Sequence, residues 1–355
     1  MSAASVVLLT LLSLTPQNRT ASEWSTAGWE ALRAGHAREA ADDFRAALEL
    51  DGRDTLSMLG AGVSAQLQGK SADAREYLAG ALRVQPTLTA ASLLLGELLY
   101  RDADLQGAIQ VYEQALALAP SQPQLTSRLE AWRREAALHD RFSQRVATHF
   151  TILFEGPADQ PLAARVADIL EGAYWRIGGA LGAYPNDVVQ VILYTTEEFR
   201  DITQSPAWAG GAFDGRIRMP VGGKIDEREL QRVLAHELTH AIVYGLARRG
   251  VPQWLNEGLA VLFEKEGLSQ ERNLVARGPL IPLSQLEKPF DDLSGDQAAL
   301  AYAESAVAAA RILDQGGPTA VFNLLSDLGN GLSFDEAFER AALMSYAEFK
   351  KKWME

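Results

Sequence analysis

The sequence repeats itself every 34 positions between about residues 21 and 122, and this period limits the possible folds more than any other feature. Four aligned columns hold a glycine, an alanine, a bulky side chain and a second alanine: Gly28, Gly62 and Gly96; Ala40, Ala74 and Ala108; Phe44, Leu78 and Tyr112; Ala47, Ala81 and Ala115. A unit of this length holds two helices that cannot bury their apolar faces alone, so neighbouring units must stack. We therefore predict an all-α solenoid over residues 21–122.

The unit resembles the tetratricopeptide (TPR) repeat, in which small residues stand where two helices cross. Trp24 occupies the consensus tryptophan position of the first unit, whereas Met58 and Ser92 depart from it in the next two. We expect residues 123–142 to form a capping helix and linker, with Trp132 shielding the last repeat. The resemblance implies a concave face that binds a protein or peptide. The alternative is a spacer, or a clamp on the domain that follows.

The period changes after the cap. Residues 148–155 and 188–195 are rich in β-branched and aromatic residues and predict two strands, separated by an amphipathic helix over 161–181. Residues 212–221 alternate polar and apolar side chains, which predicts a half-buried strand. Pro220 indicates an edge position, because proline cannot donate to a strand ladder. We expect an α+β domain with a small mixed sheet and a helical C-terminal tail.

The sequence His236-Glu237-Leu238-Thr239-His240 lies in a predicted helix over 230–246. Positions four apart return to the same side of a helix, so His236 and His240 can direct their imidazole nitrogens at one metal ion. Glu237 then stands beside the metal, where its carboxylate can take a proton from a water molecule that the metal has acidified. This is the chemistry of the H-E-x-x-H zinc hydrolases.

A catalytic zinc ion typically keeps three protein ligands and one open position, so a third ligand should follow. Residues 251–263 predict a second helix with a proline near its start. Gly250 and Pro252 provide a turn that folds it back on the first helix, and Glu257 is the acidic residue best placed to reach the metal.

The segments HELTH and WLNEGLA together resemble the gluzincins, thermolysin-like metallopeptidases whose zinc ligands are two histidines and one glutamate. Repeats followed by such a domain resemble bacterial proteins of the peptidase MA-like group. The resemblance implies a zincin-like (thermolysin-like) α+β domain over residues 143–355 that holds one Zn²⁺ ion through His236, His240 and Glu257. It also implies that the strand at 212–221 lines the cleft and pairs with a substrate peptide. The ligand types alone leave cobalt and manganese open.

Peptide hydrolysis also needs a donor that stabilises the oxyanion. Tyr302 is the candidate, because Tyr-Ala-Glu-Ser at 302–305 resembles a downstream segment of the peptidase MA-like family. A tyrosine that only packs between helices is the alternative, and Tyr244 is a weaker candidate. The other three histidines, His36, His139 and His149, lack a partner at ligand spacing. His36 and His139 lie in helical repeat sequence and are predicted to face solvent, whereas His149 lies in a predicted strand.

Composition excludes several classes of function. A net charge of -13 and a pI near 5.0 offer no basic surface for nucleic acid, and the absence of cysteine excludes disulfides and thiol nucleophiles. The apolar run at 6–14 has the length of a signal-peptide core and is too short to span a bilayer. We expect residues 1–20 to be a signal peptide of an extracytoplasmic (periplasmic or secreted) protein, with no further membrane association. A mis-assigned start or a short buried helix in a cytoplasmic protein is the alternative.

The sequence therefore predicts a zinc metallopeptidase that acts on polypeptides, with Glu237 as its base. An endopeptidase is favoured over an aminopeptidase, because residues 211–215 match poorly the Gly-x-Met-Glu-Asn segment of the aminopeptidases in this clan, although Asp214 offers a carboxylate there. The alternative function is a TPR interaction scaffold whose metal domain is catalytically silent. The intact Glu237 argues against it.

Overall fold

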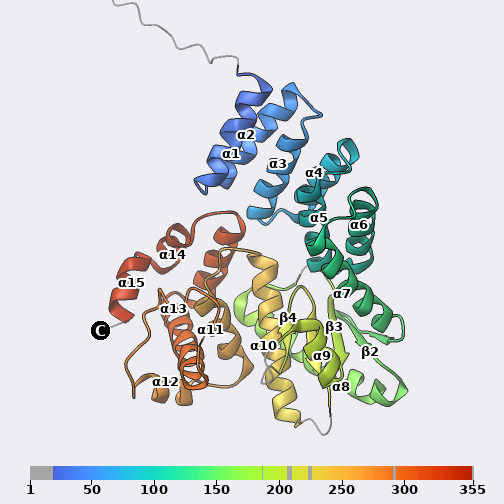
Figure 1. Cartoon of the computed structure of the whole chain (residues 1–355). Coiled ribbons are helices and arrows are strands. Elements are labelled where there is room, and N and C mark those ends of the chain that lie inside the picture. The colour runs from blue at the N-terminus through green and yellow to red at the C-terminus, as the bar shows by residue number, and fades with distance from the viewer. Residues whose placement is uncertain (1–18, 186, 206–209, 223–225, 291–292, 354–355) are drawn as a thin grey trace, which may run out of the picture.

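Three pairs of antiparallel helices form the N-terminal part of the chain, as the 34-residue period predicts (Figure 1). The computed structural model describes residues 19–185, 187–205, 210–222, 226–290 and 293–353, so the predicted signal peptide core at 6–14 lies outside it. The repeat helices are α1 (Ala21–Arg33), α2 (Ala37–Leu50), α3 (Thr55–Leu67), α4 (Ser71–Val84), α5 (Thr89–Arg101) and α6 (Leu105–Leu118). The predicted TPR solenoid is confirmed.

The repeated columns explain why the helices pair as they do. In each unit the glycine of the first helix lies against the bulky residue of the second: Gly28 with Phe44, Gly62 with Leu78, and Gly96 with Tyr112. A Cβ atom added to the glycine would lie 2.8 Å from the partner side chain in the first two pairs, a separation that packed atoms do not adopt. Glycine therefore permits the close helix crossing in every unit.

Helix α7 (Pro123–His139) packs on the last repeat. Its Trp132 is buried and stacks on Tyr100 at a ring-centroid distance of 5.1 Å, and it contacts Tyr112 at 4.6 Å. These contacts cover the apolar end of the solenoid. The chain then enters the C-terminal domain.

A five-stranded mixed sheet forms one part of the C-terminal domain. Its strands are β1 (Ser143–Val146), β2 (Phe150–Phe154), β3 (Val189–Tyr194), β4 (Ala212–Phe213) and β5 (Ile217–Pro220), in the spatial order β1-β2-β3-β5-β4. Strands β2, β3 and β5 are parallel, and the outer strands β1 and β4 are antiparallel to their neighbours. The predicted strands at 148–155 and 188–195 correspond to β2 and β3, and β1 was not predicted.

Helices cover both faces of the sheet. Helix α8 (Gln160–Leu181) and helix α10 (Glu227–Leu246) pack on the face that carries Ile152, Val191 and Ile217. Residues of α7 and the short α9 (Thr196–Thr203) pack on the other face, around Ile192 and Tyr194. The remaining helices pack beside α10: α11 (Gln253–Glu264), α12 (Ser269–Val275), α13 (Gly295–Gly329), α14 (Phe334–Ala342) and α15 (Tyr346–Trp353).

The prediction for residues 212–221 was wrong in two respects. These residues form a hairpin, β4–β5, and β5 is an inner strand that pairs with both β3 and β4. Pro220 is tolerated because it ends β5 beyond the last pair with β4. The polar positions of the alternating pattern, Arg216 and Arg218, are 1% and 0% exposed. These polar side chains are buried because helices of the N-terminal part cover the polar face of the strand.

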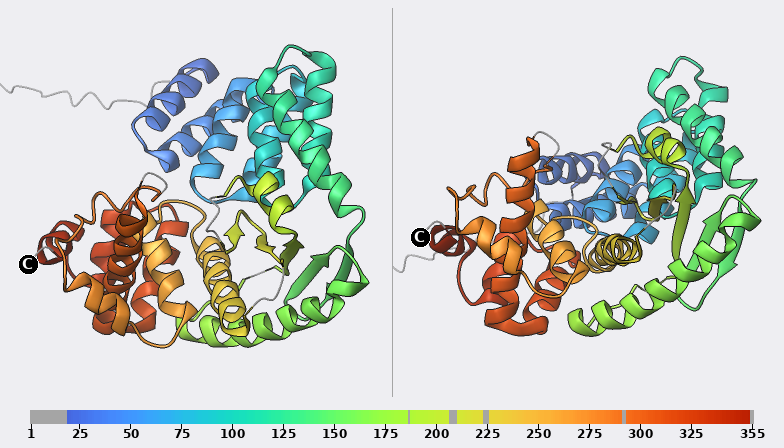
Figure 2. Two further views of the ribbon diagram at one scale, coloured as in Figure 1. Left: turned by 60° about the horizontal axis from the view of Figure 1, so that its bottom comes forward. Right: turned by 90° about the horizontal axis from the view of Figure 1, so that it is seen from below.

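The turn between the two helices of each repeat lies against the C-terminal domain (Figure 2). Arg38 donates to the backbone oxygen of Asn330, Gly69 lies beside Gly329, and Asp102 forms an ion pair with Arg248 at 2.6 Å. The solenoid therefore contacts the domain along one whole edge. Among the described residues, no helix has both the length and the apolarity that crossing a bilayer demands.

Candidate metal centre

Helix α10 carries both motif histidines. Its N-cap Asp226 accepts hydrogen bonds from the backbone N–H groups of Arg228 and Glu229, so the helix starts three residues earlier than predicted. Leu234 and Leu238 are buried in the core of the domain. The rings of His236 and His240 lie 4.8 Å apart and nearly perpendicular, as residues one turn apart on a helix should.

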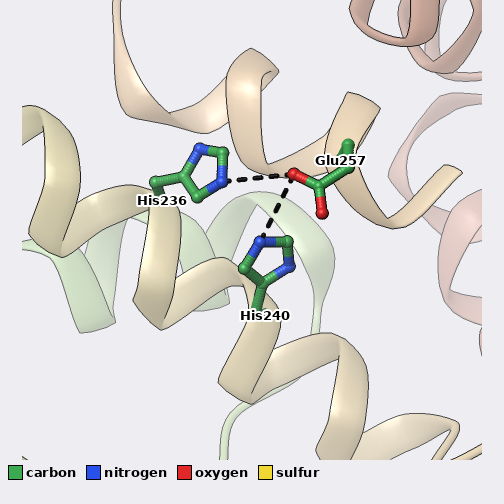
Figure 3. A group of neighbouring side chains, drawn as sticks. All are labelled: His236, His240 and Glu257. Atoms are coloured by element: carbon green, nitrogen blue, oxygen red, sulfur yellow. Dashed lines mark ion pairs between the residues drawn. The ribbon is translucent and has the colours of Figure 1, made fainter. Parts of the chain in front are cut away.

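Helix α11 brings Glu257 to the two histidines (Figure 3). Pro252 is its N-cap, as the predicted turn requires, and Gly258 allows close contact with the backbone of Ser305 in α13. The Nε2 atoms of His236 and His240 lie 3.3 and 3.6 Å from one carboxylate oxygen of Glu257. One ligand atom from each residue lies within 4.8 Å of the other two. Two imidazole nitrogens and a carboxylate oxygen that converge in this way fit the ligand set of zinc.

The other ring nitrogen of each histidine is held by α11. His236 Nδ1 lies 2.9 Å from Glu264, and His240 Nδ1 lies 3.1 Å from Asn256. These contacts direct both Nε2 atoms at Glu257, which is the arrangement that metal-binding histidines use. Sequence reasoning missed Asn256 and Glu264. Glu264 stands seven residues after Glu257, which is two helical turns. The two side chains therefore share one face of the helix, and this spacing could have predicted that Glu264 lies near the histidines.

Glu264→Gln is expected to weaken zinc binding by about 10- to 100-fold, because the amide holds His236 less firmly in its ligating orientation. The affinity is measured by competition with a chromogenic chelator. Glu229→Gln is the matched control, since Glu229 also binds Arg232 but contacts no histidine. Equal zinc affinities for the two variants would contradict the role of Glu264.

Glu237 is buried beside this centre. Burial raises its pKa to about 7, and the nearby Glu257 also raises it, although the charges of His236 and Arg232 act in the opposite direction. A carboxylate with a pKa near neutrality is suited to accept and return a proton. Burial lowers the pKa of His236, but hydrogen bonds to Glu257 and Glu264 outweigh this effect and raise the pKa to about 10. A metal ion that binds His236 must displace its proton.

A cavity of about 470 Å³ opens beside Glu237. It lies between α10, α11, α12 and α13, and its walls include Val233, Val261 and Leu274. Gly211, which precedes β4, also borders it, and a Cβ atom added there would lie 2.8 Å from Oε1 of Glu237. The cavity is therefore bounded on one side by the residues that lead into β4 and on the other by Glu237 and one predicted metal ligand, His236.

Tyr302 lies in the wall of this cavity, on α13, and its ring packs edge-on against Phe290 at 5.4 Å. The donor role of Tyr302 stays a prediction, with which its place in the cavity wall is compatible, and its contact with Phe290 is the packing that the alternative describes. Tyr244 borders a different cavity, between α10 and the repeats, where its ring contacts Phe213 and Arg248. Tyr302, and not Tyr244, shares a cavity with Glu237.

The remaining histidines do not join the centre. His36 is exposed, as expected. The prediction that His139 faces solvent was wrong, because it is largely buried and its Nε2 lies 2.7 Å from the hydroxyl oxygen of Tyr194. His149 pairs with Glu171 at 2.7 Å. Within the described parts of the chain, His236, His240 and Glu257 form the one group of three that could hold a metal ion.

Comparison with known proteins supports two family relationships. Residues 171–355 match the model described as Peptidase MA superfamily, and residues 25–86 and 59–123 match the model for the tetratricopeptide repeat. Among solved structures, the first TPR domain of Spaghetti (RPAP3) bound to the HSP90 peptide SRMEEVD is 20% identical. That match covers 33% of this chain and 96% of the other, at a TM-score of 0.31. No curated protein matches the chain.

Proposed function

The chain belongs to the peptidase MA superfamily, and from this membership and the geometry of the centre we propose that it is a zinc-dependent endopeptidase. The observation that carries the proposal is the convergence of His236, His240 and Glu257 beside a buried glutamate that borders a cavity. A structural zinc site is closed by four protein ligands, whereas three ligands beside an acid–base group and a cavity are typical of a catalytic one.

In this proposal His236, His240 and Glu257 hold one zinc ion, with Glu264 and Asn256 fixing the two imidazole rings. A zinc ion supplies Lewis-acid chemistry, which makes a water molecule acidic enough to lose a proton near neutral pH. Glu237 accepts that proton and later gives it to the leaving amine, because its buried carboxylate lies next to the metal ligands and borders the cavity. Tyr302 donates its hydroxyl proton in a hydrogen bond to the developing oxyanion.

The substrate class follows from the cleft. Strand β4 is the free edge of the sheet and begins next to Gly211, beside Glu237, so an extended polypeptide can add to it as a further strand. An aminopeptidase needs a carboxylate that binds the free amine of its substrate, and Asp214 was the candidate. Asp214 does not border the cavity beside Glu237, and its carboxylate accepts a hydrogen bond from Arg218 at 2.9 Å. This arrangement favours an endopeptidase over an aminopeptidase. The tetratricopeptide repeats provide a separate surface for a protein or peptide that brings the substrate.

Purified protein loaded with one equivalent of zinc is expected to cut unstructured casein at internal bonds, and removal of the metal with a chelator is expected to abolish the cuts. Mass spectrometry of the fragment ends provides the readout, and restoration of cleavage by added zinc is the control for the chelator. Absence of cleavage by protein with stoichiometric zinc would contradict the proposal and favour the interaction scaffold.

A further inference from the structure

Two arginines of the β4–β5 hairpin are buried against the helical repeats. Arg216 and Arg218 are among the largest fully buried side chains of the described chain. Their partners on the N-terminal side are Tyr100, at the end of α5, and Glu135, on the cap helix α7. Charged groups are expensive to bury unless they are paired, so this contact is specific.

Arg218 makes four contacts. Its Nη2 donates to the hydroxyl of Tyr100 at 2.9 Å and lies 2.8 Å from Glu135. Its Nη1 donates to the hydroxyl of Tyr194 at 2.6 Å, and its Nε donates to Asp214 at 2.9 Å. The Tyr100 hydroxyl in turn donates to Glu135 at 2.7 Å, so one hydroxyl joins the arginine of the strand to the glutamate of the cap helix.

Arg216 adds a second attachment on the same side. Its Nη2 donates to the backbone oxygen of Tyr100 at 3.0 Å, and its guanidinium lies 4.5 Å from the centre of the Tyr100 ring. At the tip of the hairpin, Gly215 leaves no room for a Cβ atom against the backbone oxygen of Arg101. The end of α5 therefore contacts the hairpin through a side chain, a backbone group and the turn itself.

Within the hairpin, β5 is held by four residue pairs with β3, whereas β4 has little of its own to hold it in place. Strand β4 makes two residue pairs with β5, Ala212 with Arg218 and Phe213 with Ile217. A two-residue strand is too short to be stable by pairing alone. Yet the residue before it, Gly211, lies against Glu237. The position of the cleft edge relative to the base thus depends on what fixes β5, namely its pairing with β3 and the contacts of Arg216 and Arg218 with the helices on its polar side.

We infer that Tyr100 and Glu135 of the solenoid are positioning residues for the substrate-pairing strand β4, acting through Arg218. The inference rests on the proposed function and deepens it, because it makes the third repeat and its cap a structural part of the peptidase site. An apolar contact would hold the two parts together equally well. A guanidinium group with several fixed donors also sets the height and direction of the strand that carries it.

Tyr100→Phe tests the inference, because it keeps the ring that stacks on Trp132 and removes the hydroxyl that joins Arg218 to Glu135. We expect faster amide hydrogen exchange over residues 211–219, with exchange in α10 and α11 unchanged. We also expect KM for a peptide substrate to rise by about tenfold, because a less firmly held β4 must be ordered when the peptide pairs with it, while kcat and zinc affinity stay the same.

Tyr112→Phe is the matched control. Tyr112 is a buried tyrosine in the same aromatic cluster, but its hydroxyl donates to Leu93 inside the repeats. Arg218→Lys is a second test, for use if Tyr100→Phe folds poorly. It keeps the positive charge but loses the planar guanidinium group, so it should show the effects expected for Tyr100→Phe. Unchanged hydrogen exchange over 211–219 in both Tyr100→Phe and Arg218→Lys would overturn the inference. Equal changes in Tyr112→Phe would overturn it as well. If wild-type protein cleaves nothing, the proposed function fails, but the exchange measurement still decides whether the solenoid positions β4.

Discussion

Glu237→Gln is expected to lower kcat for peptide hydrolysis by about 10²- to 10⁴-fold, the usual contribution of a positioned acid–base group. Glutamine has nearly the same shape as glutamate and cannot accept a proton at neutral pH, so the variant removes proton transfer and leaves the ligand set intact. Glu237 contributes no atom to the group of His236, His240 and Glu257. Initial rates of casein or peptide cleavage measure the effect, and metal analysis measures the zinc content.

The matched control is Glu271→Gln, the same chemical change in the same cavity, at a residue whose carboxylate binds Lys265 at 2.6 Å. Its kcat should stay within a few-fold of wild type. A Glu237→Gln variant that retains full activity would refute the assignment of the base. A variant that loses zinc together with activity would show instead that Glu237 supports metal binding.

Glu135→Met is expected to lower the free energy of unfolding by about 3–5 kcal/mol, because it leaves Arg216 buried without a carboxylate partner and Arg218 with Asp214 alone. Urea-induced unfolding followed by circular dichroism measures the loss. Arg133→Met is the control on the same helix: it breaks an exposed ion pair with Glu113, and such pairs contribute about 1 kcal/mol or less. The double variant Glu135→Met/Arg218→Met should lose less stability than the two single changes added together, since both single changes remove the same ion pair. Strict additivity would show that the pair does not interact.

The same pair makes stability depend on pH in a defined direction. Burial alone would raise the pKa of Glu135, but the charges of Arg218 and Arg216 and the hydrogen bond from Tyr100 outweigh it, so the pKa is lowered below its ordinary value of 4.5. A carboxylate with a depressed pKa stabilises the fold above its unfolded-state pKa and loses that contribution as the pH falls through the folded-state value. The difference in unfolding free energy between wild type and Glu135→Met should therefore shrink below about pH 4.5.

The parts of the fold that follow a local period could be predicted from the sequence. The glycine of each repeat and its bulky partner stand 16 positions apart in every unit, as Gly28 and Phe44 do. The same spacing therefore occurs three times in the sequence and indicates the same helix contact each time. The two motif histidines and Glu257 followed from helical spacing and a turn. The His236 contact with Glu264 obeys the same spacing but was not considered.

The β4–β5 hairpin could not be predicted for a physical reason. A strand with alternating polar and apolar residues normally has its polar side chains in water. These side chains are buried only where other elements cover that face of the sheet. Arg218 meets Tyr100 across 118 positions of sequence and Glu135 across a domain boundary, so no local pattern indicates the contact. His139 was misjudged for the same reason, because Tyr194 of β3 covers it.

The contact between the three repeat turns and the C-terminal domain has a consequence for how the solenoid behaves under force and during evolution. A free repeat array is elastic, since each unit touches only its neighbours and can bend or unfold separately. Here Arg38, Gly69 and Asp102, one residue from each unit, lie against a second domain. These contacts with the second domain restrain the array against bending and against the separate unfolding of one unit. A repeat added before α1 would leave these contacts in place, whereas a repeat inserted between the third unit and α7 would separate Tyr100 from Glu135.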